Sequence, residues 1–133
     1  MSKFSPDGNF LATGGSDMLL RVWRLCRTDE ETDPAWLLQD KPVREFKGHK
    51  KDIIDISWSS KFTTLLLSAS YDHSVILWNT DMQKPQQIFE HPDIVTSVCF
   101  KPESNIFVTG SFDKILRIWS TKHKKVCDWQ QAP

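Results

Sequence analysis

Hydrophobic and polar residues alternate in short runs along most of this chain. In segment 95–100, Val95, Val98 and Phe100 enclose polar residues, a pattern typical of a strand with one buried face. Four further runs are equally short and rich in the branched or large apolar side chains that favour strands: 65–70, 75–78, 106–110 and 116–119. Apolar residues never recur at helical spacing for three turns, so the pattern predicts an all-β protein.

Turn-forming residues separate these runs. The stretches SPDG at 5–8 and KPESN at 101–105 contain Pro, Gly, Asp and Asn, which favour reverse turns for distinct conformational reasons. Tight links also occur around Asp17 and Asp113. Short links of this kind join antiparallel neighbours, so each group of runs is predicted to form a four-stranded antiparallel sheet.

The same arrangement occurs three times. The stretches FSPDGNFLATGGSDMLLRVW, WSSKFTTLLLSASYDHSVILW and FKPESNIFVTGSFDKILRIW align on their final Trp. Each has an Asp six residues and a hydroxyl residue ten residues before that Trp: Thr13, Asp17 and Trp23; Ser68, Asp72 and Trp78; Thr109, Asp113 and Trp119. In the second and third units, His49 and His91 precede the opening aromatic residue by nine positions. Trp78 and Trp119 are 41 positions apart, and Trp23 and Trp78 are 55 apart because of an insertion at 24–42.

With these residues the chain resembles the WD40-repeat family, whose units are about 40–45 residues long. The residue after each Trp is Arg24, Asn79 or Ser120 instead of the usual Asp. The resemblance implies a partial β-propeller of about three four-stranded antiparallel blades. We expect residues 1–133 to be one WD40-repeat segment of a larger propeller, with three blades: a partial first blade at about 1–46, a second at about 47–89 and a third at about 90–130.

The resemblance also implies a structural role for His49, Ser68, Asp72 and Trp78. In the family, the indole N–H donates to the hydroxyl, the hydroxyl contacts the imidazole, and the imidazole contacts the carboxylate. A buried indole donor needs such an acceptor, because a buried unpaired donor costs about 1–3 kcal/mol. Two further sets are expected to act in the same way: His91, Thr109, Asp113 and Trp119 in the third unit, and Thr13, Asp17 and Trp23 in the first, which has no His.

A catalytic triad is the alternative interpretation of Ser68, His49 and Asp72, since a triad is recognised by geometry and not by chain order. The sequence has no nucleophile elbow and no Gly-rich oxyanion loop. The same set recurs in the third unit with Thr in place of Ser. We therefore expect no catalytic residue and a protein that is not an enzyme.

The residues beside the turn Asp are candidates for partner binding. Ser16, Tyr71 and Phe112 precede that Asp, and the resemblance places the turn on the narrow top face of a propeller. Exposed aromatic residues often anchor protein interfaces, although packing against the neighbouring blade would also explain them. Three charged residues in the loops that begin the second and third units could lie at the edge of the same face: Lys50, Asp52 and Asp93.

These features predict a scaffold that binds other proteins or peptides. The stretches FKGHKKDIIDISWS, EHPDIVTSVCFKP and GSFDKILRIW also resemble Rab-effector WD-repeat proteins of the rabphilin-like type, which implies a trafficking or signalling protein. No residue is assigned to GTPase binding. A partial propeller leaves apolar blade flanks exposed, so the rest of its own ring or a second copy is a further expected partner.

Charge and cysteine usage narrow the remaining classes. The chain has 17 Lys and Arg against 17 Asp and Glu, which gives no sequence-wide attraction to nucleic acid or anionic membranes. No apolar run has the length of an integral membrane segment. The three cysteines form no CxxC pair, and Cys99, in an alternating apolar stretch, is expected to be buried. Reduced thiols predict an intracellular, cytoplasmic protein. The Rab-effector resemblance implies that it could meet vesicle membranes through partners.

Other polar clusters give weaker indications of function. The four His have no metal-ligand spacing, so we expect no metal and no cofactor. The basic tetrapeptide at 122–125 is interpreted as a solvated turn, with a phosphate, nucleic-acid or acidic-peptide contact as the alternative. The insertion at 24–42 is expected to be a surface loop, in which residues 36–38 could dock on a blade or a partner.

Overall fold

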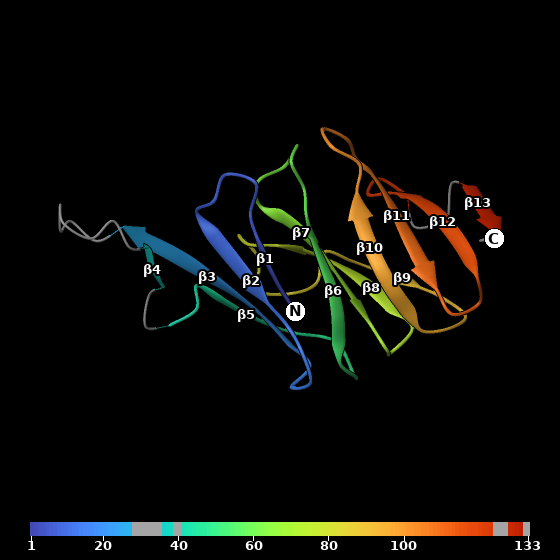
Figure 1. Cartoon of the computed structure of the whole chain (residues 1–133), viewed down its shortest axis with the longest axis horizontal. Helices are drawn as coiled ribbons and strands as arrows, with labels where there is room; N and C mark the ends of the chain where they lie inside the picture. Colours follow the sequence, from blue (N-terminus) through green and yellow to red (C-terminus); the bar gives the residue numbers. More distant parts are fainter. Residues whose placement is uncertain (28–35, 39–40, 124–127, 132–133) are drawn as a thin grey trace.

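The computed structural model describes residues 1–27, 36–38, 41–123 and 128–131 (Figure 1). All of the regular secondary structure in these ranges is strand, arranged in three antiparallel sheets that follow one another along the chain. The prediction of an all-β protein with three four-stranded antiparallel sheets is therefore confirmed. None of the described residues belongs to a helix that has the length and hydropathy to cross a membrane.

Each sheet is built from consecutive strands. The first contains β1 (Ser2–Phe4), β2 (Phe10–Thr13), β3 (Leu19–Arg27) and β5 (Arg44–Lys47), with the short β4 (Trp36–Leu38) paired to the far end of β3. The second contains β6 (Ile53–Trp58), β7 (Leu65–Ser70), β8 (Ser74–Asn79) and β9 (Gln87–Glu90). The third contains β10 (Val95–Phe100), β11 (Ile106–Ser111), β12 (Ile115–Ser120) and β13 (Asp128–Gln131).

The second sheet lies between the other two, so both of its faces are buried (Figure 1). Leu66, Ile76 and Trp78 pack with residues of the first sheet. Leu67 and Leu77, which alternate with them along the strands, pack with the third sheet. Strand β7 is buried at every position, which explains why its sequence is a continuous apolar and small-residue run instead of a strict alternation.

Part of the insertion forms a hairpin, contrary to the expected surface loop. Strand β3 continues through residues 24–27 and pairs with β4, placing Leu25 opposite Leu38. No Gly or Pro interrupts this end of β3, so nothing prevents the strand from continuing. Residues 28–35 and 39–40 of the insertion lie outside the described residues.

The turn between the second and third strand of each sheet has one conformation. Its residue after the Asp has positive φ: 65° at Met18, 71° at His73 and 65° at Lys114. This region is uncommon for residues other than Gly. In each turn the carboxylate accepts the N–H two residues later, at 3.2, 3.0 and 3.2 Å: Asp17 from Leu19, Asp72 from Ser74 and Asp113 from Ile115. The repeated Asp therefore has a local role in closing the turn.

Side chains join the second sheet to the free edge of the third. An edge strand carries N–H groups with no strand beside it, and β10 is such a strand. Two side-chain oxygens of β6 accept N–H groups of β10, both at 3.0 Å: Asp55 from Val98 and Ser57 from Phe100. A third bond continues the row into the turns that follow these strands, where Ser60 accepts the Glu103 N–H at 2.8 Å. We call these three bonds the β6–β10 seam.

The expectation that Cys99 is buried is wrong. Its neighbours Val98 and Phe100 are buried against the second sheet, and the alternation of a strand turns Cys99 to the opposite face, where it is exposed. No further sheet of the described chain covers that face.

Candidate functional site

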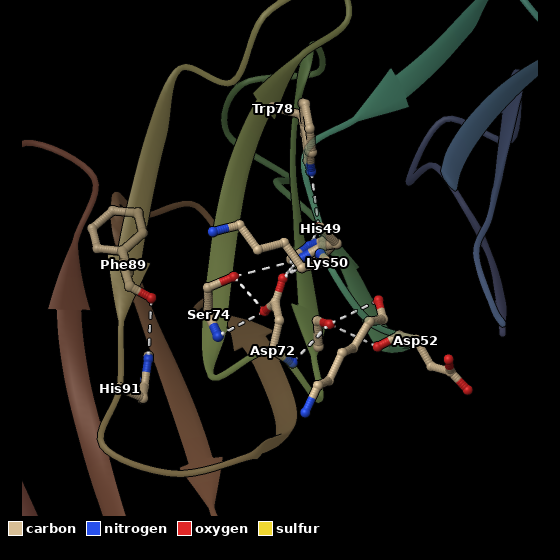
Figure 2. A network of polar contacts seen from close by, with 11 residues as sticks. His49, Lys50, Asp52, Asp72, Ser74, Trp78, Phe89 and His91 are labelled. Atoms are coloured by element: carbon tan, nitrogen blue, oxygen red, sulfur yellow. Dashed lines mark hydrogen bonds and ion pairs between the residues drawn. The ribbon is translucent and has the colours of Figure 1, made fainter. Parts of the chain in front are cut away.

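In the second sheet, four polar side chains form a continuous chain of hydrogen bonds (Figure 2). The Trp78 indole N–H donates to Ser68 Oγ at 2.8 Å, and Ser68 Oγ lies 2.6 Å from His49 Nε2. His49 Nδ1 lies 2.9 Å from Asp72 Oδ2. These contacts are consistent with one proton order, in which Ser68 donates to Nε2 and Nδ1–H donates to the carboxylate. The loop before β6, two strands and a turn are thereby tied together.

Besides the Ser74 backbone N–H described above, two further groups donate to Asp72. The Ser74 hydroxyl donates to Asp72 Oδ1 at 2.6 Å, and the Lys50 backbone N–H donates to Oδ2 at 2.9 Å. Burial by itself raises the pKa of this carboxyl, but the hydrogen bonds from His49, Ser74 and Lys50 outweigh burial and hold the pKa well below its ordinary value. Asp72 is therefore a carboxylate that accepts at both oxygens.

Close packing surrounds this network. The Trp78 ring stacks on Phe46 of the first sheet, with centroids 4.6 Å apart, and meets His49 edge-on at 6.4 Å. Gly48 passes so close that an added Cβ would lie 2.8 Å from Trp78 Cη2. The Gly-His pair thus has a steric reason: only a residue without a side chain allows His49 to lie beside the indole.

The third sheet contains the same contacts as far as the imidazole. The Trp119 indole donates to Thr109 Oγ1 at 3.0 Å, and His91 Nε2 lies 2.8 Å from that oxygen. His91 Nδ1 contacts the Phe89 carbonyl at 3.2 Å, as Figure 2 also shows. The expected contact with Asp113 is not formed.

A neighbouring arginine explains why His91 does not contact Asp113. Arg117 donates to both oxygens of Asp113, at 3.2 and 2.6 Å, and Ser111 is hydrogen-bonded to the same carboxylate. Arg117 follows the Asp by four positions, as Arg21 follows Asp17. In the second unit the corresponding residue is Ile76, so only Asp72 has no arginine beside it and is left to His49.

The first sheet retains only the indole contact. The Trp23 N–H donates to Thr13 Oγ1 at 3.0 Å, while Asp17 forms an ion pair with Arg21, which also contacts Glu45 at 3.1 Å. Sequence reasoning missed both arginines, and the signal was present: a cation four positions after the turn Asp, on the adjacent strand.

These environments shift the pKa values of the network's titratable groups. Burial lowers the pKa of His91 to about 4, despite the Phe89 carbonyl that favours its charged form. The Arg117 hydrogen bond lowers the pKa of Asp113 to about 2, and the Arg21 hydrogen bond lowers the pKa of Asp17. His91 is thus a neutral, buried imidazole at neutral pH.

The contacts of Ser68, His49 and Asp72 also have the distances of a catalytic triad. Ser68 has no exposed surface, however, and its oxygen already accepts the Trp78 indole N–H. A nucleophile must reach its substrate. In this arrangement the hydroxyl is enclosed by indole and imidazole, so the geometry favours support of the sheet over attack on a substrate.

The candidate partner-binding residues lie at one end of the sheets. Phe112 is 57% exposed and Tyr71 is 39% exposed, and Ser16 is exposed at the matching turn. Met18, which the sequence analysis did not single out, adds a further exposed apolar side chain beside Ser16. We call this end the top face.

The three charged residues proposed as its rim differ in position. Lys50 is exposed, and its side chain extends past Asp72 in Figure 2. Asp52 is half-buried, and its carbonyl accepts the Ser70 hydroxyl at 2.7 Å. Asp93 is half-buried, and its carboxylate accepts the adjacent Ile94 N–H at 2.7 Å. Lys50 is therefore the most exposed of the three, and of the two carboxylates that of Asp93 is engaged by a neighbouring N–H.

In residues with described positions, no group of three or more His, Cys, Asp or Glu is placed to hold a metal ion. Residues 124–127, which include half of the basic tetrapeptide, lie outside the described residues, while Lys122 and His123 are exposed after β12.

Comparison with known proteins gives consistent matches. The family model for the WD domain, G-beta repeat, matches residues 1–24, 40–79 and 83–120. An uncharacterised WD repeat-containing protein of Schizosaccharomyces pombe is 33% identical over 146 residues, which cover 98% of this chain and 25% of that protein. A subunit of chromatin assembly factor 1 from Mus musculus is 32% identical, covering 93% of this chain and 23% of its own length. Protein HIR1 of Cryptococcus neoformans is 30% identical, covering 98% and 15%. The chain spans a quarter or less of the length of these relatives.

Proposed function

Since the chain belongs to the WD40-repeat family, we propose that it is a non-catalytic scaffold whose top face binds a partner protein. The exposure of Phe112 is the main observation that supports this proposal. It is the most exposed aromatic residue on that face, at 57%, and it sits in a turn closed by a carboxylate-to-backbone bond. An aromatic side chain held on a rigid turn loses little conformational freedom on binding, which favours its use as an interface anchor.

The class of partner is proposed from the relatives. One of them is named as a subunit of chromatin assembly factor 1, and the match covers 93% of this chain. WD40 propellers share one architecture among many functions, so the name alone does not transfer a partner. We propose that this segment joins its own protein to a multi-subunit assembly of that kind.

The experiment is co-purification of the tagged intact chain from a nuclear extract, with bound proteins quantified by mass spectrometry. Tyr71→Ser with Phe112→Ser should reduce recovery of chromatin-assembly subunits about tenfold, because hot-spot aromatics contribute about 2 kcal/mol or more. Met82→Ser, at an exposed apolar residue in the turn between β8 and β9 at the opposite end, is the matched control and should bind normally. Unchanged recovery with the top-face variant, or no such subunits with the native chain, would contradict the proposal.

The absence of catalysis is part of the proposal. An activity-based fluorophosphonate probe should leave Ser68 unlabelled in the folded chain, because the hydroxyl is buried between Trp78 and His49. Stoichiometric labelling of Ser68, lost in His49→Gln, would instead support a hydrolase.

We also propose that the three sheets are blades of a larger ring, with boundaries at about 1–46, 47–89 and 90–130. Both end faces of the row are apolar. Phe4, Leu11 and Trp23 align across the face of the first sheet that points away from the second, and Leu116 on β12 is 40% exposed. Faces of this kind are normally covered by another blade.

The narrower likeness to rabphilin-like Rab-effector proteins has no support among these relatives and stays a prediction, as does a cytoplasmic location at vesicle membranes. Neutral charge and the absence of a membrane-length apolar run remain the reasons to expect protein partners instead of nucleic acid or lipid.

A further inference from the structure

A cleft of about 340 Å³ opens at the end of the molecule opposite the top face, between the second and third sheets. We call it the lower cleft. The second sheet contributes the turn between β6 and β7 and the turn between β8 and β9. The third contributes the turn before β11 and the turn after β12. Among the described residues, its lining contains one lysine, three side-chain amides and no carboxylate.

The lower cleft offers hydrogen-bond donors that no described residue engages. Asn79 Oδ1 is used by the Asp81 N–H at 2.9 Å, and Gln86 Oε1 is used by Asn79 Nδ2 at 3.4 Å. The acceptor atoms of these two amides are therefore engaged. The Gln86 amino group and the ammonium group of Lys122, which is exposed, remain as donors. A ligand that pairs with these two donors supplies carbonyl or carboxylate oxygens.

At the corresponding position between the first and second sheets, a side chain spans the junction. Thr80 and Thr121 are equivalent, because each donates its N–H at 2.9 Å to the residue before the second strand of its sheet: Thr80 to Thr64 and Thr121 to Asn105. The Thr80 carbonyl accepts Arg44 Nε at 2.6 Å, which bridges the first two sheets. No described side chain bridges to the Thr121 carbonyl in this way, and the lower cleft opens there.

An aromatic side chain lies at one wall of the lower cleft. Phe62 is 39% exposed, and Lys61 Nζ lies 5.4 Å from its ring centroid. The ring offers a surface for an apolar side chain, and the ammonium group above it adds positive charge on the same side. Apolar contact and anion-binding donors therefore occur side by side.

We propose that the lower cleft binds an extended peptide segment of a partner protein in which a carboxylate residue is next to an apolar residue. The carboxylate pairs with Lys122 and the Gln86 amino group, and the apolar side chain packs on Phe62. The side-chain amides pair with peptide groups, as in other recognition of extended chains. Nucleic acid fits less well, because a phosphate backbone calls for several cations and stacking rings in series, whereas one lysine lines this cleft.

The test selects short linear peptides from a randomised display library on the intact chain and measures the affinity of each recovered peptide. We expect enrichment of Asp or Glu beside Leu, Ile, Met or Phe. Lys122→Glu and Gln86→Ala should each weaken these peptides about tenfold, as the loss of a charge-assisted hydrogen bond does. Lys84→Glu, an exposed charge reversal on the same turn as Gln86 but outside the lining, should leave affinity unchanged.

Other results would overturn the proposal. These are peptides that bind Lys122→Glu as well as the native chain, enrichment without acidic residues, no peptide at all, or oligouridylate binding that Lys122→Glu abolishes while peptides do not bind. Near-ultraviolet circular dichroism verifies that each variant is folded. Tyr71→Ser with Phe112→Ser should not affect lower-cleft peptides, so failure of this inference and failure of the top-face proposal are distinguishable.

Discussion

At the residue scale, the second sheet depends on the hydroxyl of Ser68. It accepts the Trp78 indole N–H and contacts His49, and all three groups are buried. Ser68→Ala would leave a buried indole donor and an imidazole without their partner. We predict a loss of about 3 kcal/mol in the free energy of unfolding, measured by urea denaturation.

Ser68→Thr is the matched control, because Thr109 and Thr13 accept the same indole bond in the other sheets. It should cost less than the alanine variant. Equal stability of Ser68→Ala and the native chain would show that the hydrogen-bonded chain contributes nothing to folding.

His91 makes a pH-dependent contribution. Its pKa is about 4 in the folded chain and 6.5 in the reference state, so the unfolded chain binds a proton over that interval while the folded chain does not. The free energy of unfolding should therefore fall as the pH drops from about 6.5 to 4, by about 3 kcal/mol at most. The facing groups are Thr109, the Phe89 carbonyl, Arg117 and Asp113.

Urea unfolding at pH 7, 6, 5 and 4 measures this dependence. His91→Gln should flatten the profile over that interval, whereas His73→Gln, at an exposed histidine, should leave the dependence in place. The carboxyl groups of Asp72 and Asp113 have lowered pKa values in the folded chain, so they stabilise it above about pH 3.8. This stabilisation is lost only as the pH falls below that value. A native profile that is flat between pH 6.5 and 4 would contradict the prediction.

At the scale of elements, sequence reasoning identified the strand runs, the turn positions and the grouping around each Trp. Those features depend on local alternation and spacing. It could not assign the partner of each turn Asp, because that choice is a competition between a histidine before the sheet and an arginine four positions later. Arg117 prevails over His91 because a bidentate guanidinium bond is local and strong. The lower cleft was not predictable either, since it forms between turns about 40 residues apart.

The turns with positive φ allow a stability prediction. Lys114 is exposed and has a φ of 65°, a conformation that Gly adopts without steric cost. Lys114→Gly should raise the free energy of unfolding by about 0.5–1 kcal/mol, measured by urea denaturation, because relief of left-handed strain exceeds the entropic cost of Gly. Lys101→Gly, at an exposed residue that is not in this conformation, should give no gain. A destabilised Lys114→Gly would mean that its side chain, and not its backbone, matters in the turn.

At the scale of the whole molecule, the row of sheets ends in two apolar faces. Phe4 is 64% exposed on the first and Leu116 is 40% exposed on the third. We predict that the isolated chain self-associates through these faces, and that Phe4→Lys with Leu116→Lys shifts it toward monomer. Light scattering after size exclusion, over a tenfold range of concentration, measures the effect. A native chain that is monomeric throughout would contradict self-association.

In the β6–β10 seam, the second sheet must supply particular side chains, whereas the third sheet supplies only its backbone. One side supplies the oxygen atoms of particular side chains, Asp55, Ser57 and Ser60, and the other supplies only main-chain N–H groups. Every amino acid except proline carries that N–H. The junction is therefore sensitive to mutation mainly on the side of the second sheet. A single substitution there can remove an acceptor, whereas the donors of the third sheet are kept in any substitution except to proline.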